Sequence, residues 1–230
     1  MVAAISVATL SVAVILCKIL FLKNAGIKVG FLSKLISSAL FCLTGIIAAF
    51  SRGRLDIFAA LMLIALAAAF AGDILLAAPA FLKDEYKGLF SAAGGAAFLF
   101  SHLLYIVVFL CAAPPILYLI PVAAVVPILY GCFIKAKLLS PKKNSVPIVA
   151  YGAVLGCLIF SASGLALNGL VLGYLALPAA LLFVLSDTAL FFYNFGHRPF
   201  AVSRTAVNYL ILLPYYAAQA LFAVAVFFLP

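Results

Sequence analysis

The sequence predicts an all-α fold, a polytopic membrane bundle of about eight transmembrane helices. Of the 230 residues, 69% are hydrophobic and only 8% are charged, whereas a soluble domain is nearer half apolar and a quarter charged. The charged residues stand mostly between long apolar runs. Such a chain has too little polar surface to cover itself in water, so we expect lipid to be its solvent.

The individual spans follow from the charges, prolines and glycines that separate the apolar runs. A spanning helix needs about twenty mostly apolar residues, and a helix satisfies every backbone polar group within its own segment. In chain order, we expect spans at 3–22 before Lys23, 34–50 between Lys34 and Arg52, 56–78 before Pro79, 88–111 after Lys87, 115–134 before Lys135, 146–167 after Lys143, 170–194 before Gly196, and 203–229. The second span is short, and Pro121 and Pro127 interrupt the fifth. The whole chain, 1–230, is interpreted as a single transmembrane helical domain.

A weak internal echo suggests that this domain has two parallel halves, 1–112 and 113–230. Asp73 lies late in the third span and Asp187 lies late in the seventh. Four helices apart, these two spans run in the same direction. One helix after each Asp comes a polar and aromatic pair at a matching offset. A parallel duplication of two four-helix halves would account for both features.

The basic residues occupy alternate connections between the spans. Only Arg52 and Arg54 belong to the even-numbered connections, and the odd-numbered ones hold Lys18, Lys23, Lys28, Lys34, Lys83, Lys87, Lys135, Lys137, Lys142, Lys143, Arg198 and Arg204. Basic loops stay cytoplasmic, so both termini are predicted to face away from the cytoplasm. We assign the net charge of +9 to topology and to anionic lipid headgroups. Neither nucleic acid nor a protein partner is expected, and in a bacterium the chain would lie in the cell membrane.

Only five residues are acidic, and two of them lie inside apolar runs. Asp84 and Glu85 are expected in a solvated loop, and Asp56 as the N-cap of the third helix. Asp73 and Asp187 remain. A charge deep in the bilayer costs roughly 2.5–3.5 kcal/mol, so such residues usually face a bundle interior and mark function. The alternative is a structural carboxyl that pairs with a helix terminus or a Lys.

The two intramembrane acids lie at similar depths. Asp73 is about 8 Å and Asp187 about 10 Å from the cytoplasmic end of its helix, at 1.5 Å per residue. The two carboxyl groups can therefore meet in a shared cavity if the third and seventh helices are neighbours.

Further polar residues could line such a cavity. His102 and Tyr105 are one turn apart and share a helix face. In the last span, Tyr216 and Gln219 are also one turn apart, and Asn208 lies near the depth of the two acids. For His102, a satisfied structural histidine is as good an interpretation as a substrate contact.

No cofactor and no metal is expected. A zinc hydrolase usually needs three protein ligands, and no ligand spacing in the chain supports such a site. The five cysteines are scattered one per apolar segment with no Cys-x-x-Cys, so neither a disulfide framework nor a thiolate site is indicated. The Gly-x-Ser-x-Gly elbow of serine hydrolases and phosphate-cradling glycine loops are absent from the sequence.

Several polar motifs occur in order along the chain. They are Gly72-Asp73-x-x-Leu76, His102-Leu103-Leu104-Tyr105 followed by Phe109, Pro147-x-x-x-Tyr151-Gly152, Leu185-Ser186-Asp187-x-x-Leu190 followed by Phe195, and Tyr215-Tyr216-Ala217-Ala218-Gln219. Over about residues 30–222, this pattern resembles the lysoplasmalogenase (YhhN-like) membrane family. The resemblance implies an eight-helix enzyme that hydrolyses the vinyl ether bond of lysoplasmalogens, which are lysophospholipids. The products would be a fatty aldehyde and glycerophosphocholine or glycerophosphoethanolamine.

The resemblance also implies roles for individual residues. Asp73 and Asp187 match the family's two motif aspartates, to which catalysis would be assigned. The family's other polar positions are matched by His102, Tyr105, Tyr216 and Gln219. Lys34 matches a basic position in the second helix, although the proline that often follows it in the family is missing here.

Vinyl ether hydrolysis suits a pair of buried carboxyl groups. The reaction begins with proton transfer to the β-carbon and passes through an oxocarbenium ion, as glycosidase reactions do. Two carboxyl groups close together in a low-dielectric cavity cannot easily ionise together, so one remains an acid while the other stabilises the cation and activates water. Two alternatives use the same residues: a small proton-coupled transporter and a non-catalytic lipid-binding protein. Against the transporter, the two halves lack a matching pair of Gly- or Pro-broken helices.

Overall fold

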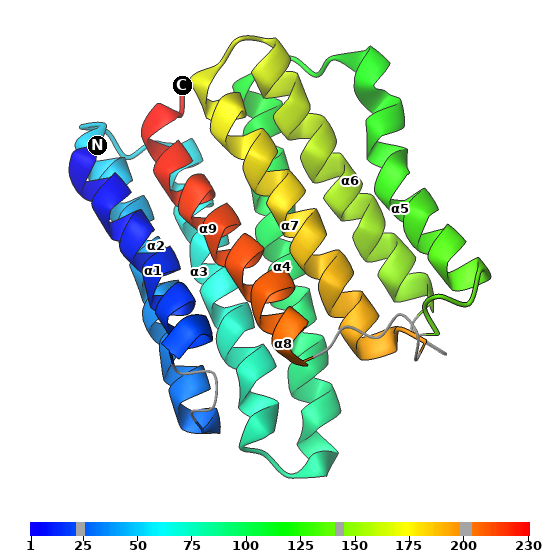
Figure 1. The fold of residues 1–230 in the computed structure, drawn as a ribbon. Coiled ribbons are helices and arrows are strands. Elements are labelled where there is room, and N and C mark those ends of the chain that lie inside the picture. Colours follow the sequence, from blue (N-terminus) through cyan, green and yellow to red (C-terminus); the bar gives the residue numbers. More distant parts are fainter. Residues whose placement is uncertain (22–25, 141–144, 198–203) are drawn as a thin grey trace. The chain divides into compact units, whose positions relative to one another are not determined.

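A computed structural model of the chain describes residues 1–21, 26–140, 145–197 and 204–230, and these residues are almost entirely helical (Figure 1). The α-helices are α1 (Val2–Phe21), α2 (Ile27–Ser51), α3 (Ile57–Ala77), α4 (Asp84–Ala112), α5 (Ile120–Lys135), α6 (Ser145–Leu167), α7 (Val171–Phe195), α8 (Arg204–Val207) and α9 (Leu213–Ala225). Short 3-10 helices are η1 (Ala78–Ala80), η2 (Leu117–Leu119) and η6 (Val226–Phe228), and a π-helix, η5 (Asn208–Leu212), joins α8 to α9. Within the described residues, extended pairing is limited to one isolated bridge between Leu139 and Gly196. The all-α prediction is confirmed.

Most of these helices are long and apolar enough to cross a membrane. In the described part of the chain seven stretches qualify, and the eighth expected span is the shorter helix α5. At 1.5 Å per residue, its 16 residues rise about 24 Å, which is less than the roughly 30 Å of a bilayer's hydrocarbon core. Many large apolar side chains lie exposed on the helix surfaces, as expected where lipid is the solvent. The predicted multi-pass bundle is therefore confirmed.

Two helices begin earlier than the sequence predicted, because a charge at a helix end does not break the helix. Helix α2 begins at Ile27 rather than at residue 34, so its first turns carry lysines. Helix α4 begins at Asp84 rather than at residue 88. The prediction that Asp84 and Glu85 lie in a loop is wrong: they form the first turn of α4. Carboxylates are favoured there by the helix dipole, and Lys87 Nζ lies 2.6 Å from Asp84 Oδ1.

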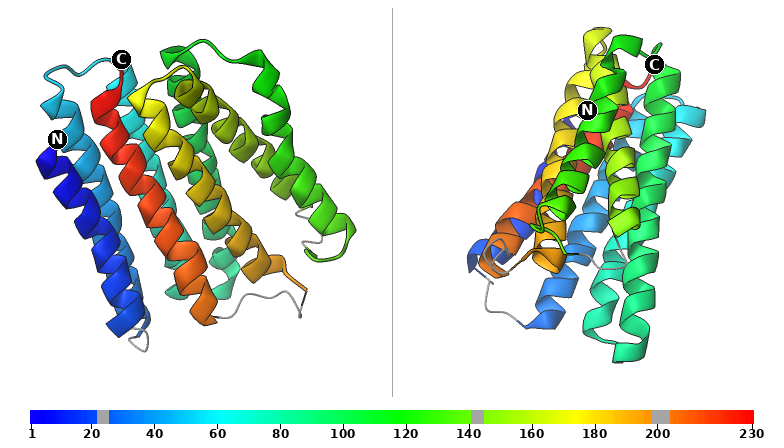
Figure 2. Two further views of the ribbon diagram at one scale, coloured as in Figure 1. Left: turned by 45° about the horizontal axis from the view of Figure 1, so that its top comes forward. Right: turned by 90° about the vertical axis from the view of Figure 1, so that its right-hand side faces the viewer.

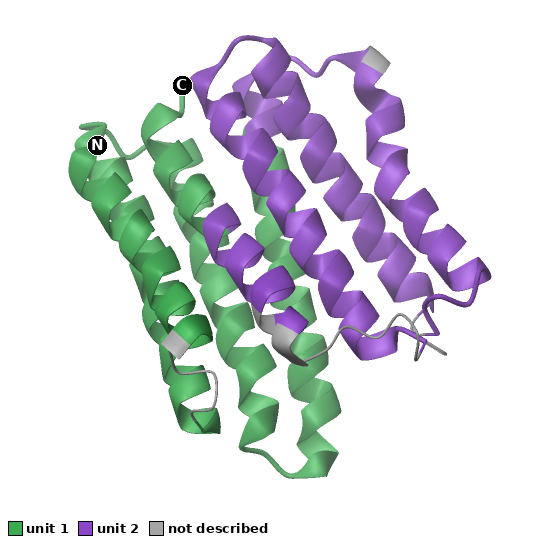
Figure 3. Cartoon of the chain, in the orientation of Figure 1, with its two compact units in different colours: residues 1–108, 219–230 green, residues 109–218 purple. Residues whose placement is uncertain are grey.

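The chain forms two compact units, which Figure 3 colours separately. The first unit comprises Met1–Val108 and Gln219–Pro230, and the second comprises Phe109–Ala218. In the first unit, α2 packs against both α1 and α3. A reciprocal pair of buried hydrogen bonds joins α1 to α2: Ser11 Oγ donates to the Ser37 carbonyl at 2.8 Å, and Ser37 Oγ donates to the Ser11 carbonyl at 3.0 Å.

The second unit is built on helices α5, α6 and α7, which lie side by side (Figure 2). Helices α5 and α6 touch at Gly156, where any side chain would meet the backbone of Ala123. Small residues allow this close approach, which supplies the packing that holds helices together in lipid. A buried cluster continues the interface, formed by Val126, Tyr130, Ile148 and Leu155.

The end of the first unit where both chain termini lie is held by charged groups (Figure 1). Asp56 is the N-cap of α3, as predicted, because its Oδ1 accepts from the Ala59 backbone N–H at 2.9 Å. Arg52 donates to Asp56 Oδ2 at 3.0 Å and to the carbonyls of Leu229 and Pro230 at 3.2 and 2.9 Å. The Arg52 hydrogen bond lowers the pKa of Asp56 to about 2. These contacts tie the α2–α3 turn to the end of the chain.

Replacing Asp56 should therefore destabilise the first unit. We expect Asp56→Ala to lower the stability by about 0.5–2 kcal/mol through loss of the cap, and Asp56→Asn, which keeps the cap, to lose less. Because the pKa of this carboxyl is depressed in the fold, its stabilisation is present above the ordinary value of 3.8 and fades as the pH falls towards about 2. Thermal melting in detergent should show that the difference in melting temperature between wild type and Asp56→Asn becomes smaller as the pH falls from 3.8 towards about 2. A gap that stays constant down to the lowest pH would contradict this account.

The predicted topology is also open to test. Both termini should face away from the cytoplasm, because the basic connections stay on the cytoplasmic side. Alkaline phosphatase, which is active only outside the bacterial cytoplasm, should be active when fused after Pro230 and inactive when fused within the connection between α3 and α4. The opposite pattern of activity would reverse the assigned orientation.

Candidate functional site

Asp73 lies in the fifth turn of α3 and is buried, with 8% of its surface exposed. Its Oδ2 accepts a hydrogen bond of 2.6 Å from Ser38 Oγ, which comes from α2. A hydroxyl is a neutral donor, so it fixes the direction of the carboxyl group without adding a charge. Helices α2 and α3 thus position the first of the two predicted acids.

The Asp73 side chain borders a hollow in the first unit. It is a shallow depression without room for a water molecule, and its lining consists of Phe31, Lys34, Leu35, Asp73, Ile74 and Ala77. Lys34 stands one turn before Ser38 on α2, so the two share a helix face. The structure therefore brings the predicted basic residue and the predicted acid of this unit to the lining of one hollow.

Helix α4 approaches the same region through Gly72. A Cβ atom at Gly72 would lie 2.8 Å from the Phe98 ring, so only glycine allows the ring to pack here without a shift. The Phe98 carbonyl accepts a hydrogen bond of 2.6 Å from His102 Nδ1. His102 is fully buried. Gly72 thus allows the Phe98 ring to pack against α3. The backbone carbonyl of the same Phe98 binds the predicted histidine, His102.

The two other predicted polar residues of this unit meet each other. Tyr105 OH donates to Gln219 Oε1 at 3.1 Å, and both residues are fully buried. The Tyr105 ring stacks on Phe222, with 4.4 Å between the ring centroids. Since Tyr105 belongs to α4 and Gln219 to α9, the hydrogen bond joins segments that are far apart in sequence.

Asp187 belongs to the second unit, and its surroundings are aromatic. Tyr151 OH, from α6, donates to Asp187 Oδ2 at 2.9 Å. From α5, Tyr130 OH lies 3.0 Å from the Thr188 hydroxyl. No cation pairs with Asp187 among the residues that the structure describes. Like Asp73, this carboxyl is 8% exposed and has one oxygen fixed by a neutral hydroxyl.

The last helix of the second unit is irregular next to Asp187. Ser186 Oγ donates to the Ile211 carbonyl at 2.9 Å, within the π-helix η5. A π-helix leaves wider hydrogen-bond spacing and occurs often at functional sites. Tyr216 is fully buried. Asn208 begins η5, but its side chain lies outside the described part of the structure.

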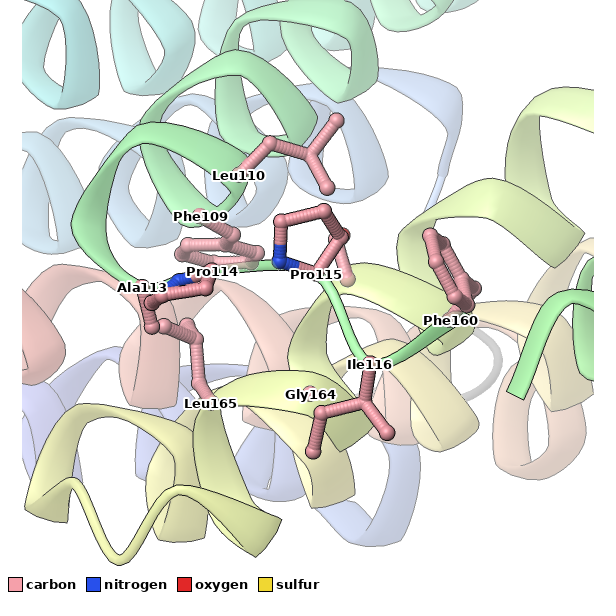
Figure 4. A pocket seen from close by; sticks show the side chains of 10 residues that line it. Phe109, Leu110, Ala113, Pro114, Pro115, Ile116, Phe160, Gly164 and Leu165 are labelled. Atoms are coloured by element: carbon pink, nitrogen blue, oxygen red, sulfur yellow. The ribbon is translucent and has the colours of Figure 1, made fainter. Parts of the chain in front are cut away.

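The second unit has a small hollow of its own (Figure 4). Its lining is mostly apolar and includes Pro114, Pro115, Phe160 and Leu165. Phe160 and Leu165, which belong to α6, lie roughly 14–21 Å along the helix from Tyr151, at 1.5 Å per residue. This hollow is therefore separate from the surroundings of Asp187.

Sequence reasoning found the acids but missed the groups that hold them. Ser38 was not singled out, although its spacing of four residues from Lys34 was a usable signal. Tyr151 stood in a recognised motif without an assigned role. Within either unit, no three His, Cys, Asp or Glu side chains of the described residues come close enough to hold a metal ion. The meeting of Asp73 and Asp187 in one cavity stays a prediction, because each acid belongs to a different unit.

Comparison with known proteins gives one match. The model of the YhhN family matches residues 29–226, which is most of the chain. No curated protein and no solved structure matches it.

The packing at Gly72 gives a testable contrast between two glycines. Gly72→Ala should force the Phe98 ring to move and lower the stability by about 1–3 kcal/mol, as overpacking does. Gly95→Ala on α4 is the matched control, because a Cβ atom there meets nothing within 4 Å. That control should be neutral or stabilising by up to about 1 kcal/mol, since Ala favours helix. Equal melting temperatures for the two variants in detergent would contradict the close packing of α3 and α4 at this point.

Proposed function

The chain belongs to the YhhN family, and from this we propose that it hydrolyses the vinyl ether bond of lysoplasmalogens with two intramembrane aspartates. The observation that carries the proposal is that both Asp73 and Asp187 are buried in helices, each with Oδ2 held by a hydroxyl group. Buried acids in membrane helices usually serve function rather than stability. The substrate is a single-chain lipid, so it can reach the protein by lateral diffusion in the bilayer.

The reaction needs one acid and one base and no cofactor. A carboxylic acid gives its proton to the β-carbon of the vinyl ether, and the carbon next to oxygen becomes an oxocarbenium ion. A carboxylate stabilises this cation and takes a proton from the water that adds to it. The resulting hemiacetal then loses the glycerol oxygen as an alcohol, giving a fatty aldehyde and the glycerophospho-base. The acid and base of glycosidases handle a similar cation in the same way.

The hydroxyl partners suit this division of labour. Ser38 and Tyr151 each fix one oxygen of a carboxyl group, which aims the other oxygen. Among the described residues, Oδ1 of Asp187 accepts no hydrogen bond, so it is available to substrate or water. The proposal requires the two carboxyl groups to face one chamber, about 5–10 Å apart by analogy with glycosidases.

The remaining predicted residues are proposed to bind the substrate. Lys34 lines the same hollow as Asp73, so its ammonium group can hold the headgroup phosphate while the vinyl ether lies against the carboxyl. Only a glycerol unit separates these two parts of a lysoplasmalogen. The buried polar side chains proposed to complete the binding site are His102, Tyr105, Tyr216 and Gln219. Asn208 is proposed to join them.

The central test is aldehyde release by purified protein from lysoplasmenyl-ethanolamine and lysoplasmenyl-choline. Asp73→Asn and Asp187→Asn should each reduce release by at least about 100-fold, the low end of what a general acid or base contributes. Asp84→Asn is the matched control, because Asp84 is exposed in the first turn of α4, and it should leave the rate unchanged. Unchanged turnover in both intramembrane variants would reject the mechanism.

Two further variants test whether the hydroxyl partners of the acids contribute to the rate. Ser38→Ala and Tyr151→Phe should lower the rate less than loss of either acid, because they free the carboxyl groups from their hydroxyl partners but keep the carboxyl groups themselves. Flux of a small solute into proteoliposomes without aldehyde release would point instead to a carrier.

A further inference from the structure

Two aromatic side chains stand together at the edge of the hollow beside Asp73. Phe31 lies in the second turn of α2 and is one of the residues that line the hollow. Phe81 directly follows η1, which continues α3, and its ring meets the Phe31 ring edge to face, with 5.4 Å between the centroids. Phe81 is 50% exposed. The pair therefore presents aromatic surface on the outside of the first unit, where α2 begins and α3 ends.

This aromatic pair begins a row of different chemical groups along α2. Phe31, Lys34 and Ser38 follow one another at intervals of three and four residues, so they share one helix face. Ser38 holds the Asp73 carboxyl by its hydrogen bond. Phe31 stands about 10 Å along the helix from Ser38, with Lys34 between them. From the start of α2 inwards, the order is aromatic, cationic and acidic.

A lysoplasmalogen with a choline headgroup carries matching groups in the same order. Its trimethylammonium group is outermost, the phosphate follows, and the vinyl ether lies beyond the glycerol. Nine bonds separate the nitrogen from the ether oxygen, and an extended chain advances by about 1.2 Å per bond, so these atoms are about 11 Å apart. That span is close to the distance along α2 between the aromatic pair and the serine that holds the acid.

The aromatic end of the row distinguishes between headgroups. A quaternary ammonium group has no proton to donate, and proteins recognise it through the faces of aromatic rings. The primary ammonium group of ethanolamine donates up to three hydrogen bonds, as a lysine does, and needs acceptors for them. Apart from Lys34 and Asp73, the side chains that line the hollow are apolar. The surroundings of Phe31 and Phe81 therefore suit choline better than ethanolamine.

We propose that Phe31 and Phe81 bind the trimethylammonium group of a choline headgroup, and so make the protein prefer choline lysophospholipids to ethanolamine lysophospholipids. Because the hollow is shallow, the headgroup lies across its surface and is not enclosed in a pocket. The placement rests on the proposed function, since it takes the phosphate to Lys34 and the vinyl ether to Asp73. Binding of the headgroup itself does not require the ether bond to be cleaved.

Lipids that cannot be cleaved test this preference directly. Lysophospholipids with a saturated alkyl ether lack the double bond that the reaction protonates. Their dissociation constants are measured with radiolabelled choline and ethanolamine forms on purified protein in nanodiscs. Wild type should bind the choline form at least about twofold more tightly. Phe31→Leu and Phe81→Leu remove a ring but keep an apolar side chain, so each should weaken choline binding about two- to fivefold and leave ethanolamine binding unchanged.

Two further variants separate the aromatic contact from a general apolar one. Phe81→Trp should keep or strengthen the preference for choline, because the face of Trp binds cations best. Phe50→Leu is the matched control, since Phe50 is 68% exposed near the other end of α2, and it should change neither affinity. Equal binding of the two headgroups by wild type would overturn the proposal. So would an equal loss of both affinities in the Leu variants, or no measurable binding of either lipid.

Aldehyde release from the matching lysoplasmalogens separates this proposal from the enzymatic one. A choline preference that depends on the two rings, without aldehyde release from either headgroup form, would contradict the proposed reaction and leave the headgroup site standing. Aldehyde release combined with equal binding of choline and ethanolamine lipids would contradict the headgroup site and leave the reaction standing.

Discussion

The structure depends on one constraint: inside a bilayer, every polar group must find its partner within the protein. Helices meet this for the backbone, and several buried side chains meet it in pairs. Ser11 and Ser37 exchange hydrogen bonds with each other's backbone. The two intramembrane acids follow the same rule, because each accepts from a hydroxyl on a neighbouring helix. A hydroxyl partner satisfies a carboxyl group without neutralising it, so the acid is held in place and keeps its chemistry.

At the helix ends, charged groups pair with each other instead of with hydroxyl groups. Around the α2–α3 turn, Arg52 and Asp56 form a salt bridge with 3.0 Å between Nη2 and Oδ2, and Arg52 also binds carbonyls at the end of the chain. Here the purpose is anchorage, since a guanidinium group can serve several acceptors at once. Within the first unit, ionic contacts thus fix the end of the bundle at Arg52 and Asp56, while Asp73 accepts a hydrogen bond from the neutral Ser38 hydroxyl.

The sequence was sufficient to predict the helices and the acids, but not the partners of the acids. A run of twenty apolar residues can be recognised within one segment of the sequence, and so can the N-cap at Asp56. By contrast, the choice of Ser38 among the serines of α2 depends on how α2 is rotated against α3, which no local pattern encodes. The loop predicted for Asp84 and Glu85 failed for a related reason: charge alone was taken as a helix break, although acids favour the first turn of a helix.

That rotation of α2 has a structural explanation. Successive helical residues point about 100° apart, so Ser37 and Ser38 face different neighbours. Ser37 is bound to α1 in both directions, and Ser38 is bound to Asp73 on α3. These three hydrogen bonds, on two sides of one helix, fix its rotation about its own axis. Because Lys34 shares the face of Ser38, the same hydrogen bonds direct the lysine to the hollow beside Asp73. The first unit therefore orients its whole polar face through a pair of adjacent serines.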